Sequence, residues 1–174
     1  MIIMFVRCYQ NDRILPILHF SHRLHASKGN AIVSYLPSGM PSPEPSPEDA
    51  PFWEACKQHK LLIQHCNACQ RFYHPPMPSC AHCGSTNVGW QEVSGEGTVF
   101  SYTVAHHAVH KALKGHTPYN IVVVMLNDAG DVRLVSNLVD TAPADIYIDM
   151  PVTLHWEEVD KGMVLPRFRS KEAS

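Results

Sequence analysis

Two Cys-x-x-Cys pairs carry the clearest chemistry in this sequence of 174 residues. Cys66 and Cys69 form the first pair, Cys80 and Cys83 form the second, and residues 70–79 separate them. Each such turn presents two thiolates to one ion, and zinc prefers four ligands at the corners of a tetrahedron. The spacing therefore predicts a structural Zn²⁺ site with a closed shell, which leaves no position for a catalytic water.

Other uses of paired cysteines stay open at this point. They are two disulfides, a redox-active pair, and an iron or iron–sulfur centre. Three histidines beside the pairs are alternative ligands: His65, His74 and His82. The apolar start of the chain, residues 1–6, is too short for a secretory signal or a membrane span, so we expect a reducing, cytoplasmic compartment with no membrane association. Residues 13–28 bear a weak likeness to a mitochondrial transit peptide.

A helix and short strands are the elements that must position the cysteine pairs. Pro51 follows the acidic residues Glu48 and Asp49, a pattern typical of a helix start. A helix over residues 51–60 would place four residues on one face that docks on a neighbour: Phe52, Ala55, Cys56 and His59. We expect the strands that lead into and out of the two pairs at 61–64, 72–74 and 90–93.

After the second pair, strand and turn signals alternate at the spacing of a small barrel. Five strands are predicted, over residues 98–104, 121–126, 132–138, 152–158 and 163–168. Val152, Leu154 and Trp156 should point inward from the fourth strand. Residues 139–150 leave room for one turn or helix, where a five-stranded OB barrel places its connection. The predicted fold is mainly β: an N-terminal helix and zinc ribbon followed by a five-stranded OB-fold barrel.

The composition divides the chain into three parts. Residues 37–51 are rich in proline, serine and glutamate, and such a tract predicts an extended, disordered linker. We expect residues 1–47 to be a disordered tail with this linker, residues 48–94 to be the helix and ribbon, and residues 95–170 to be the barrel. The region before the linker shows no helical or strand periodicity, so a natural start at Met40 is our hypothesis.

Several motifs together resemble domain-of-unknown-function family thirty-five, whose members are acyl-CoA-associated OB-fold proteins with a rubredoxin-like zinc ribbon in front. The resemblance covers residues 48–169, and its motifs are residues 50–55, 61–66, 73–76, 80–84, 95–104, 118–119 and 150–152. One departure is Asp149 before Met150, where many members have glycine. The resemblance implies a non-catalytic accessory subunit that joins a thiolase-like, acyltransferase or enoyl-CoA hydratase enzyme in a hetero-oligomer and helps to hold CoA or acyl-CoA.

Coenzyme A needs cations or backbone amides for its phosphates. The candidates are Lys111, Lys114, Arg133, Arg167 and Arg169, each of which is otherwise an ordinary surface charge. The candidate anchors for a partner are five aromatic residues: Phe52, Trp53, Phe72, Tyr73 and Trp90. An equally good interpretation is that these aromatic residues pack between the ribbon and the barrel. Four histidines gather in the first barrel loop (His106, His107, His110 and His116), but no nucleophile motif accompanies them.

The alternative function is that of a single-stranded nucleic-acid-binding protein, because zinc ribbons and OB barrels both occur in such proteins. Phe100 and Tyr102 would then be stacking platforms. The charge argues against this function, since the whole chain has 14 Lys and Arg against 16 Asp and Glu. Clustered positive charge supplies most of the sequence-independent binding energy for nucleic acid, so we do not expect nucleic acid as the partner.

Overall fold

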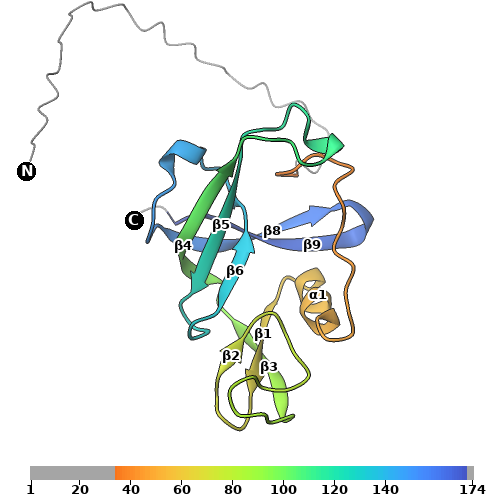
Figure 1. Cartoon of the computed structure of the whole chain (residues 1–174), viewed down its shortest axis with the longest axis vertical. Coiled ribbons are helices and arrows are strands. Elements are labelled where there is room, and N and C mark those ends of the chain that lie inside the picture. Colours follow the sequence, from red (N-terminus) through yellow and green to blue (C-terminus); the bar gives the residue numbers. More distant parts are fainter. Residues whose placement is uncertain (1–33, 172–174) are drawn as a thin grey trace, which may run out of the picture. The chain divides into compact units, whose positions relative to one another are not determined.

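The computed structural model describes residues 34–171, and these form a mainly β fold with one α-helix (Figure 1). Helix α1 (Ala50–Lys57) is followed by a three-stranded antiparallel sheet with strand order β2-β1-β3. Its strands are β1 (Leu61–Cys66), β2 (Phe72–Tyr73) and β3 (Val88–Val93). This small sheet is the ribbon that carries the cysteine pairs. The helix and the ribbon precede the barrel, as the sequence predicts.

Helix α1 is shorter than expected. Its N-cap residue is Asp49, whose carboxylate accepts hydrogen bonds from Ser46 N (2.6 Å) and Trp53 Nε1 (3.0 Å). Phe52, Ala55 and Cys56 are buried as predicted. The helical position predicted for His59 is wrong, because this exposed residue lies beyond the helix at a φ of 57°, in the left-handed region that ends a helix. Its ring still contacts a neighbour, since it stacks on Trp156 with ring centroids 5.7 Å apart.

The barrel is a six-stranded sheet with the order β6-β5-β4-β8-β9-β7. Neighbouring strands are antiparallel except β7 and β9, whose parallel pairing closes the sheet. Parallel pairing of the third and fifth segments is OB topology, so the predicted fold class is confirmed. The strands are β4 (Glu96–Ala105), β5 (Tyr119–Leu126), β6 (Arg133–Ser136), β7 (Leu138–Val139), β8 (Pro151–Val159) and β9 (Met163–Ser170). Short 3-10 helices lie at Lys111–Leu113, Pro143–Asp145 and Asp160–Gly162.

The predicted third strand, residues 132–138, is in fact two strands separated at Asn137. β6 pairs with β5 at one edge of the sheet, and β7 pairs with β9 at the other edge. The buried side chain of Asn120 bridges the change of partner: its Nδ2 donates to Leu138 O (2.8 Å) and its Oδ1 accepts from Leu138 N (2.7 Å). An amide side chain thus replaces the ladder bonds where the strand leaves β5.

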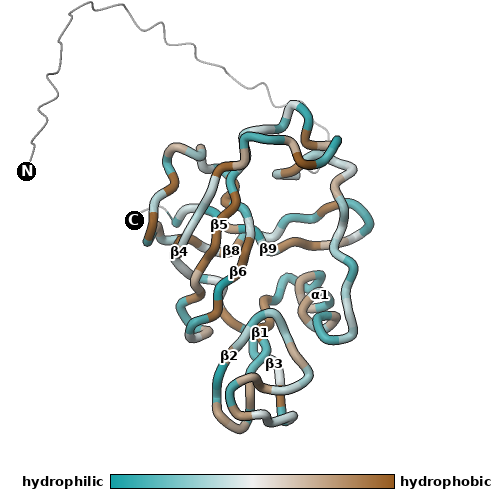
Figure 2. The backbone as a smooth tube through the Cα atoms, viewed as in Figure 1, coloured by the Kyte–Doolittle hydropathy of each residue, from teal (hydrophilic) through white to brown (hydrophobic). Residues whose placement is uncertain are grey.

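One buried cluster joins the helix, the ribbon and the barrel. It includes Phe52 from α1, Ile63 and Val93 from the ribbon, and Val122 and Phe168 from the barrel. Figure 2 shows hydrophobic residues along much of β5, which is one source of this cluster. On β8, Val152 is fully buried as predicted, whereas Leu154 and Trp156 are only partly buried and pack against the cluster. The ribbon and the barrel therefore share one core.

Residues 34–43, called the strap here, lie within the predicted tail and linker. The segment 34–49 contains neither helix nor strand, but its beginning is bonded to the barrel. Ser34 Oγ donates to Glu157 Oε1 (3.0 Å), Tyr35 N donates to the same oxygen, and Asn120 N donates to Tyr35 Oη (3.1 Å). A disordered tail would leave these groups unpaired.

The remainder of the predicted tail, including Cys8 and the segment that resembles a transit peptide, lies outside the described residues. Within residues 34–171, no helix has the length and the apolar character that are needed to cross a lipid bilayer.

Candidate functional site

The four cysteines of the two pairs come together at one end of the ribbon. Their Sγ atoms all lie within 4.8 Å of one another. Cys66 and Cys83 are 3.6 Å apart, as are Cys69 and Cys80. A tetrahedron with Zn–S bonds of 2.3 Å has edges of about 3.8 Å, whereas a disulfide needs about 2.05 Å. The geometry fits one four-coordinate metal ion and does not fit two disulfides.

The two cysteine turns have the same backbone structure. In each turn the first cysteine's carbonyl accepts from the residue four positions on: Gln70 N to Cys66 O and Gly84 N to Cys80 O, both 2.8 Å. Gln70 and Gly84 both have a left-handed φ, 61° and 73°. Two equivalent turns that face each other across a ribbon present four thiols to one point, which is the rubredoxin-like arrangement.

Hydrogen bonding and burial shift the pKa values of these four thiols in different directions. The backbone N–H of Cys83 lowers the pKa of the Cys80 thiol to about 7. The backbone N–H of Cys69 likewise lowers the pKa of Cys66. Burial, with the neighbouring cysteines, raises the pKa of Cys69 to about 12. A divalent cation would replace the remaining protons and offset the charge that four thiolates bring together.

Tyr73 lies near the four cysteines. Among the described residues, its hydroxyl is the one buried side-chain polar atom that has no hydrogen-bond partner. Burial raises the pKa of Tyr73, and the charges of the four cysteines raise it further. The residue pattern predicted Tyr73 as a strand residue and a docking anchor, and it did not predict this position near the cysteines.

The histidines near the cysteine pairs have other roles in the described structure. His65 Nε2 is bonded to Gln70 Oε1 (3.2 Å), and its ring packs on Phe72. His74 is half-buried against Phe52, with ring centroids 5.2 Å apart. Within residues 34–171, the one cluster of histidine, cysteine and acidic groups with metal-binding geometry is the set of four cysteines. The donor set therefore supports a structural zinc site.

Comparison with known proteins agrees with this geometry. Residues 53–89 match the model of the rubredoxin-like zinc ribbon domain of ChsH2, and residues 90–157 match the model of the C-terminal OB-fold domain of ChsH2. A DUF35 domain-containing scaffold protein of Methanocaldococcus jannaschii is 30% identical over 125 residues, and the match covers 68% of this chain and 86% of that protein. The chain belongs to the DUF35 family.

Two further relatives are named as subunits of hydratases. A probable enoyl-CoA hydratase alpha subunit of Thermomonospora curvata is 49% identical over 119 residues, and a 3-oxo-4,17-pregnadiene-20-carboxyl-CoA hydratase alpha subunit of Mycobacterium tuberculosis is 38% identical over 117. The matches cover 68% and 67% of this chain but only 36% of each relative. This chain thus spans about a third of the length of those two proteins.

Solved structures show the same fold. A chain of the Ltp2-ChsH2(DUF35) aldolase is 45% identical, with a TM-score of 0.67, and the match covers 74% of this chain and 98% of that one. A Sulfolobus solfataricus protein of the DUF35 family is 18% identical, with a TM-score of 0.52 and coverages of 72% and 87%, which indicates the fold alone.

The five cations predicted for coenzyme A do not gather in one place. Lys111 and Lys114 are exposed in the loop before β5, whereas Arg133 is paired with Met125 at the other end of that strand. The six positions from Tyr119 to Met125 correspond to about 20 Å along the strand. Arg169 is bonded to His155 Nδ1 (2.5 Å) and lies 4.0 Å from Asp140.

Arg167 is buried and already paired, which is the opposite of an available surface cation. Its Nε donates to Glu157 Oε2 at 2.6 Å, and its Nη1 donates to Asn137 Oδ1. No local sequence pattern predicts this ion pair, because Glu157 was expected only as part of an alternating strand. Arg133 and Arg169 are exposed, but Arg133 stacks on Phe100 and Arg169 is bonded to His155. Lys111 and Lys114 therefore remain our main candidates for contact with phosphate.

The aromatic residues predicted as docking anchors are all at least partly covered. Phe52 belongs to the core, and Trp53, Phe72 and Trp90 pack against it. Among the described residues, the large apolar side chains that are exposed are different ones: Phe100, Tyr102, Val109, Val135, Tyr147 and Ile148. The sequence did not predict most of these, because only the strand pairing shows which side of β4 and β6 is left uncovered by the described residues.

Two of these exposed residues, Phe100 and Val135, belong to one surface, the outer face of β4, β5 and β6. Val135 of β6 lies opposite Val123 of β5, and their side chains point away from the buried positions on either side. Phe100 stands at the β-bulge of β4, and the Arg133 guanidinium lies 4.0 Å over its ring. Val135 is 73% exposed and Phe100 is 46% exposed. Ile148, which is 52% exposed, lies outside these strands, on the connection that leads into β8. This connection is bonded to β4, because Asp149 N donates to Val99 O.

Proposed function

We propose that this DUF35 chain is a non-catalytic accessory subunit that docks on a larger acyl-CoA enzyme, of the thiolase-like or hydratase-like kind. The names of the relatives support this function, since they are called subunits of acyl-CoA hydratases, a scaffold protein and a component of an aldolase. The structural zinc would hold the ribbon in shape, and it would take no part in a reaction, since four thiolates complete its shell.

The observation that carries the proposal is the outer face of β4, β5 and β6. Phe100, Val123 and Val135 form an apolar surface, and the Phe100–Arg133 pair provides a stacked arginine within it. Aromatic residues and arginine are the types that most often dominate the energy of an interface. We infer that a partner protein covers this face with an apolar patch and sets a carboxylate opposite Arg133, so that the assembly is a hetero-oligomer.

We assign no catalytic role to the loop histidines. His106, His107 and His116 are exposed, and His110 Nδ1 accepts a hydrogen bond from Ala112 N (3.2 Å) as the cap of a short 3-10 helix. A general base needs a nucleophile or a substrate proton within hydrogen-bond reach. Contact of Lys111 and Lys114 with coenzyme A phosphates, and a cytoplasmic location, remain our predictions.

Capture from source-cell extract followed by reconstitution with the purified partner tests the docking surface. Three baits are compared: the wild-type chain, Val135→Asp on the outer face, and the matched control Val109→Asp. Val109 is 78% exposed in the loop between β4 and β5, so both variants add one charge at an open valine. An acyl-CoA enzyme should bind the wild-type chain and Val109→Asp in a fixed ratio, and Val135→Asp should bind about tenfold or more weakly.

Two outcomes would contradict this function. In the first, Val135→Asp binds the acyl-CoA enzyme as tightly as the control, which would remove the face from the interface. In the second, only nucleic acid or nucleic-acid enzymes are recovered, with binding that falls steeply with salt. The second outcome would favour the nucleic-acid alternative, with Phe100 as a stacking platform.

A further inference from the structure

A buried ion pair lies on β8 and β9, under the strap. Glu157 and Arg167 are 6% and 9% exposed, and the two charges cancel. Both carboxylate oxygens of Glu157 are in use: one accepts from Arg167 Nε, and the other from Ser34 and Tyr35 of the strap. The strap is therefore bonded to the barrel through this pair.

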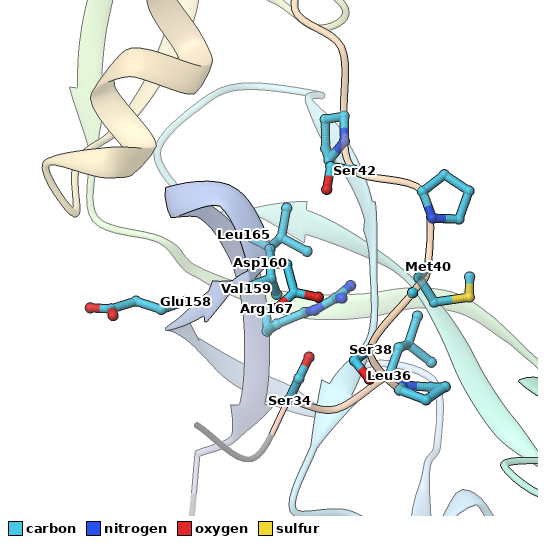
Figure 3. A pocket seen from close by; sticks show the side chains of 14 residues that line it. Ser34, Leu36, Ser38, Met40, Ser42, Glu158, Val159, Asp160, Leu165 and Arg167 are labelled. Atoms are coloured by element: carbon cyan, nitrogen blue, oxygen red, sulfur yellow. The ribbon is translucent and has the colours of Figure 1, made fainter. Parts of the chain in front are cut away.

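Beyond Tyr35, the strap and the end of the β8–β9 hairpin enclose a pocket of about 550 Å³. This volume lies within the range of small-molecule sites, about 300–1,000 Å³. The strap contributes Leu36, Met40 and three prolines to the wall, and the hairpin contributes Val159 and Leu165. Figure 3 shows the Arg167 guanidinium extending toward the strap in the space between Leu165 and Met40.

Arg167 determines which polar group this pocket accepts. It is the one cationic residue among the described residues that line the pocket. Its Nε and Nη1 are bonded to protein, whereas Nη2 has no partner within residues 34–171. Nη2 therefore offers hydrogen-bond donors to the pocket. Because Glu157 already neutralises the guanidinium, and Asp160 adds a negative charge to the lining, an anion would gain little from entering.

We propose that this pocket binds a neutral acyl carbonyl compound, a thioester or an amide with an apolar chain. The carbonyl oxygen accepts from Arg167 Nη2, and the chain lies between Leu36 and Met40 of the strap and Leu165 of the hairpin. A neutral carbonyl brings no charge into the pocket. It accepts a hydrogen bond from Arg167 Nη2, a donor that has no other partner within residues 34–171. The choice of an acyl thioester rests on the proposed function, whereas the pocket itself does not involve the docking face.

The test is direct binding to the full chain alone, without any partner enzyme. The probe is S-octanoyl-N-acetylcysteamine, a neutral thioester without nucleotide, and octanoate is the matched anion with the same chain. Methyl-resolved NMR should show saturable shifts at Met40 and Leu165 with the thioester, and about tenfold weaker binding of octanoate. Octanoyl-CoA is the third probe, and it distinguishes two sources of the acyl group. If the natural ligand is a CoA ester, octanoyl-CoA should bind at least as tightly as the small thioester. If the natural ligand is a free acyl compound, octanoyl-CoA should bind more weakly.

Variants at Met40 make the test specific to the pocket. Met40→Trp fills the space from the strap side and should weaken thioester binding about tenfold or more, whereas Met40→Leu keeps the volume and should stay within about twofold. Val109→Trp, in the exposed loop between β4 and β5, should leave binding unchanged. Absence of saturable shifts, equal binding of octanoate, or unchanged binding in Met40→Trp would each overturn the proposal. None of these results touches the docking experiment, so the two proposals can fail separately.

Discussion

Tyr35→Phe is the most direct test of whether the strap is part of the folded protein. The Tyr35 hydroxyl accepts a hydrogen bond from the backbone N–H of Asn120, at 3.1 Å. Asn120 is fully buried on β5. Phenylalanine keeps the ring and its packing but removes the acceptor, so the variant leaves one buried N–H without a partner.

The size of the effect follows from that single orphaned donor. An unsatisfied buried backbone group costs about 1–3 kcal/mol. For a folded region of this size, that corresponds to a fall in Tm of about 3–10 °C. Burial also raises the pKa of the Tyr35 hydroxyl, so the neutral form that makes the bond is present throughout the neutral pH range. The loss should therefore be the same at pH 6 and pH 8.

Urea unfolding followed by tryptophan fluorescence measures the change in free energy of unfolding. The control is Tyr147→Phe, because Tyr147 is 56% exposed on the barrel surface and should give almost no change. A chain that begins at Met40 lacks Ser34 as well as Tyr35, and it should lose more stability than Tyr35→Phe does. If Tyr35→Phe and the Met40 version both match the control, the strap does not bind the barrel in solution, and the reasoning from these contacts is wrong.

Three other changes test separate features. Cys80→Ser should reduce bound zinc, measured by mass spectrometry of the native protein, and should unfold the ribbon, because metal-binding energy in such modules is folding energy; full metal content would reject the site. Burial lowers the pKa of His74, with a smaller opposing effect of Asp49. The unfolded chain therefore binds more protons just below pH 6.5, and stability should fall as the pH drops through that window. This fall should be smaller in His74→Gln in paired urea titrations at pH 7 and pH 5.5, and an equal fall would contradict the assignment. Gly97→Ala would place a Cβ 2.5 Å from the backbone oxygen of Met125, so we expect a loss of about 2–4 kcal/mol. Alanine at Gly89 should cost less, because its Cβ would meet only the end of the Asn67 side chain, at 3.3 Å.

The sequence was sufficient for the parts of the fold that depend on local patterns. The four cysteines at Cys-x-x-Cys spacing indicate a common metal centre, and the structure brings their Sγ atoms within 4.8 Å. The five-strand barrel was also predictable, because alternation of apolar residues and turn signals marks each strand. His59 was placed wrongly because helical periodicity carries no information about where a left-handed residue ends the helix.

What the sequence could not predict depends on which strands become neighbours. Arg167 looks like a surface cation until the pairing of β8 with β9 places it beside Glu157 under the strap. Asn137 interrupts a continuous strand pattern because the chain changes partner from β5 to β9 there. The strap itself is rich in proline and serine, so its composition predicts disorder. It is held by three hydrogen bonds to groups far away in the sequence, which no local pattern reveals.

The shared core has a consequence for the role of the metal. Ile63 and Val93, on the ribbon strands that flank the cysteine turns, belong to the same buried cluster as Val122 and Phe168 of the barrel. The ribbon is too small to bury a core of its own, so the metal and the barrel must hold it together. In turn, the ribbon covers apolar surface at one end of the barrel. A structural ion in this arrangement therefore stabilises more than its own turns: it keeps the barrel core closed and so supports the outer face of β4, β5 and β6 that we propose as the docking surface.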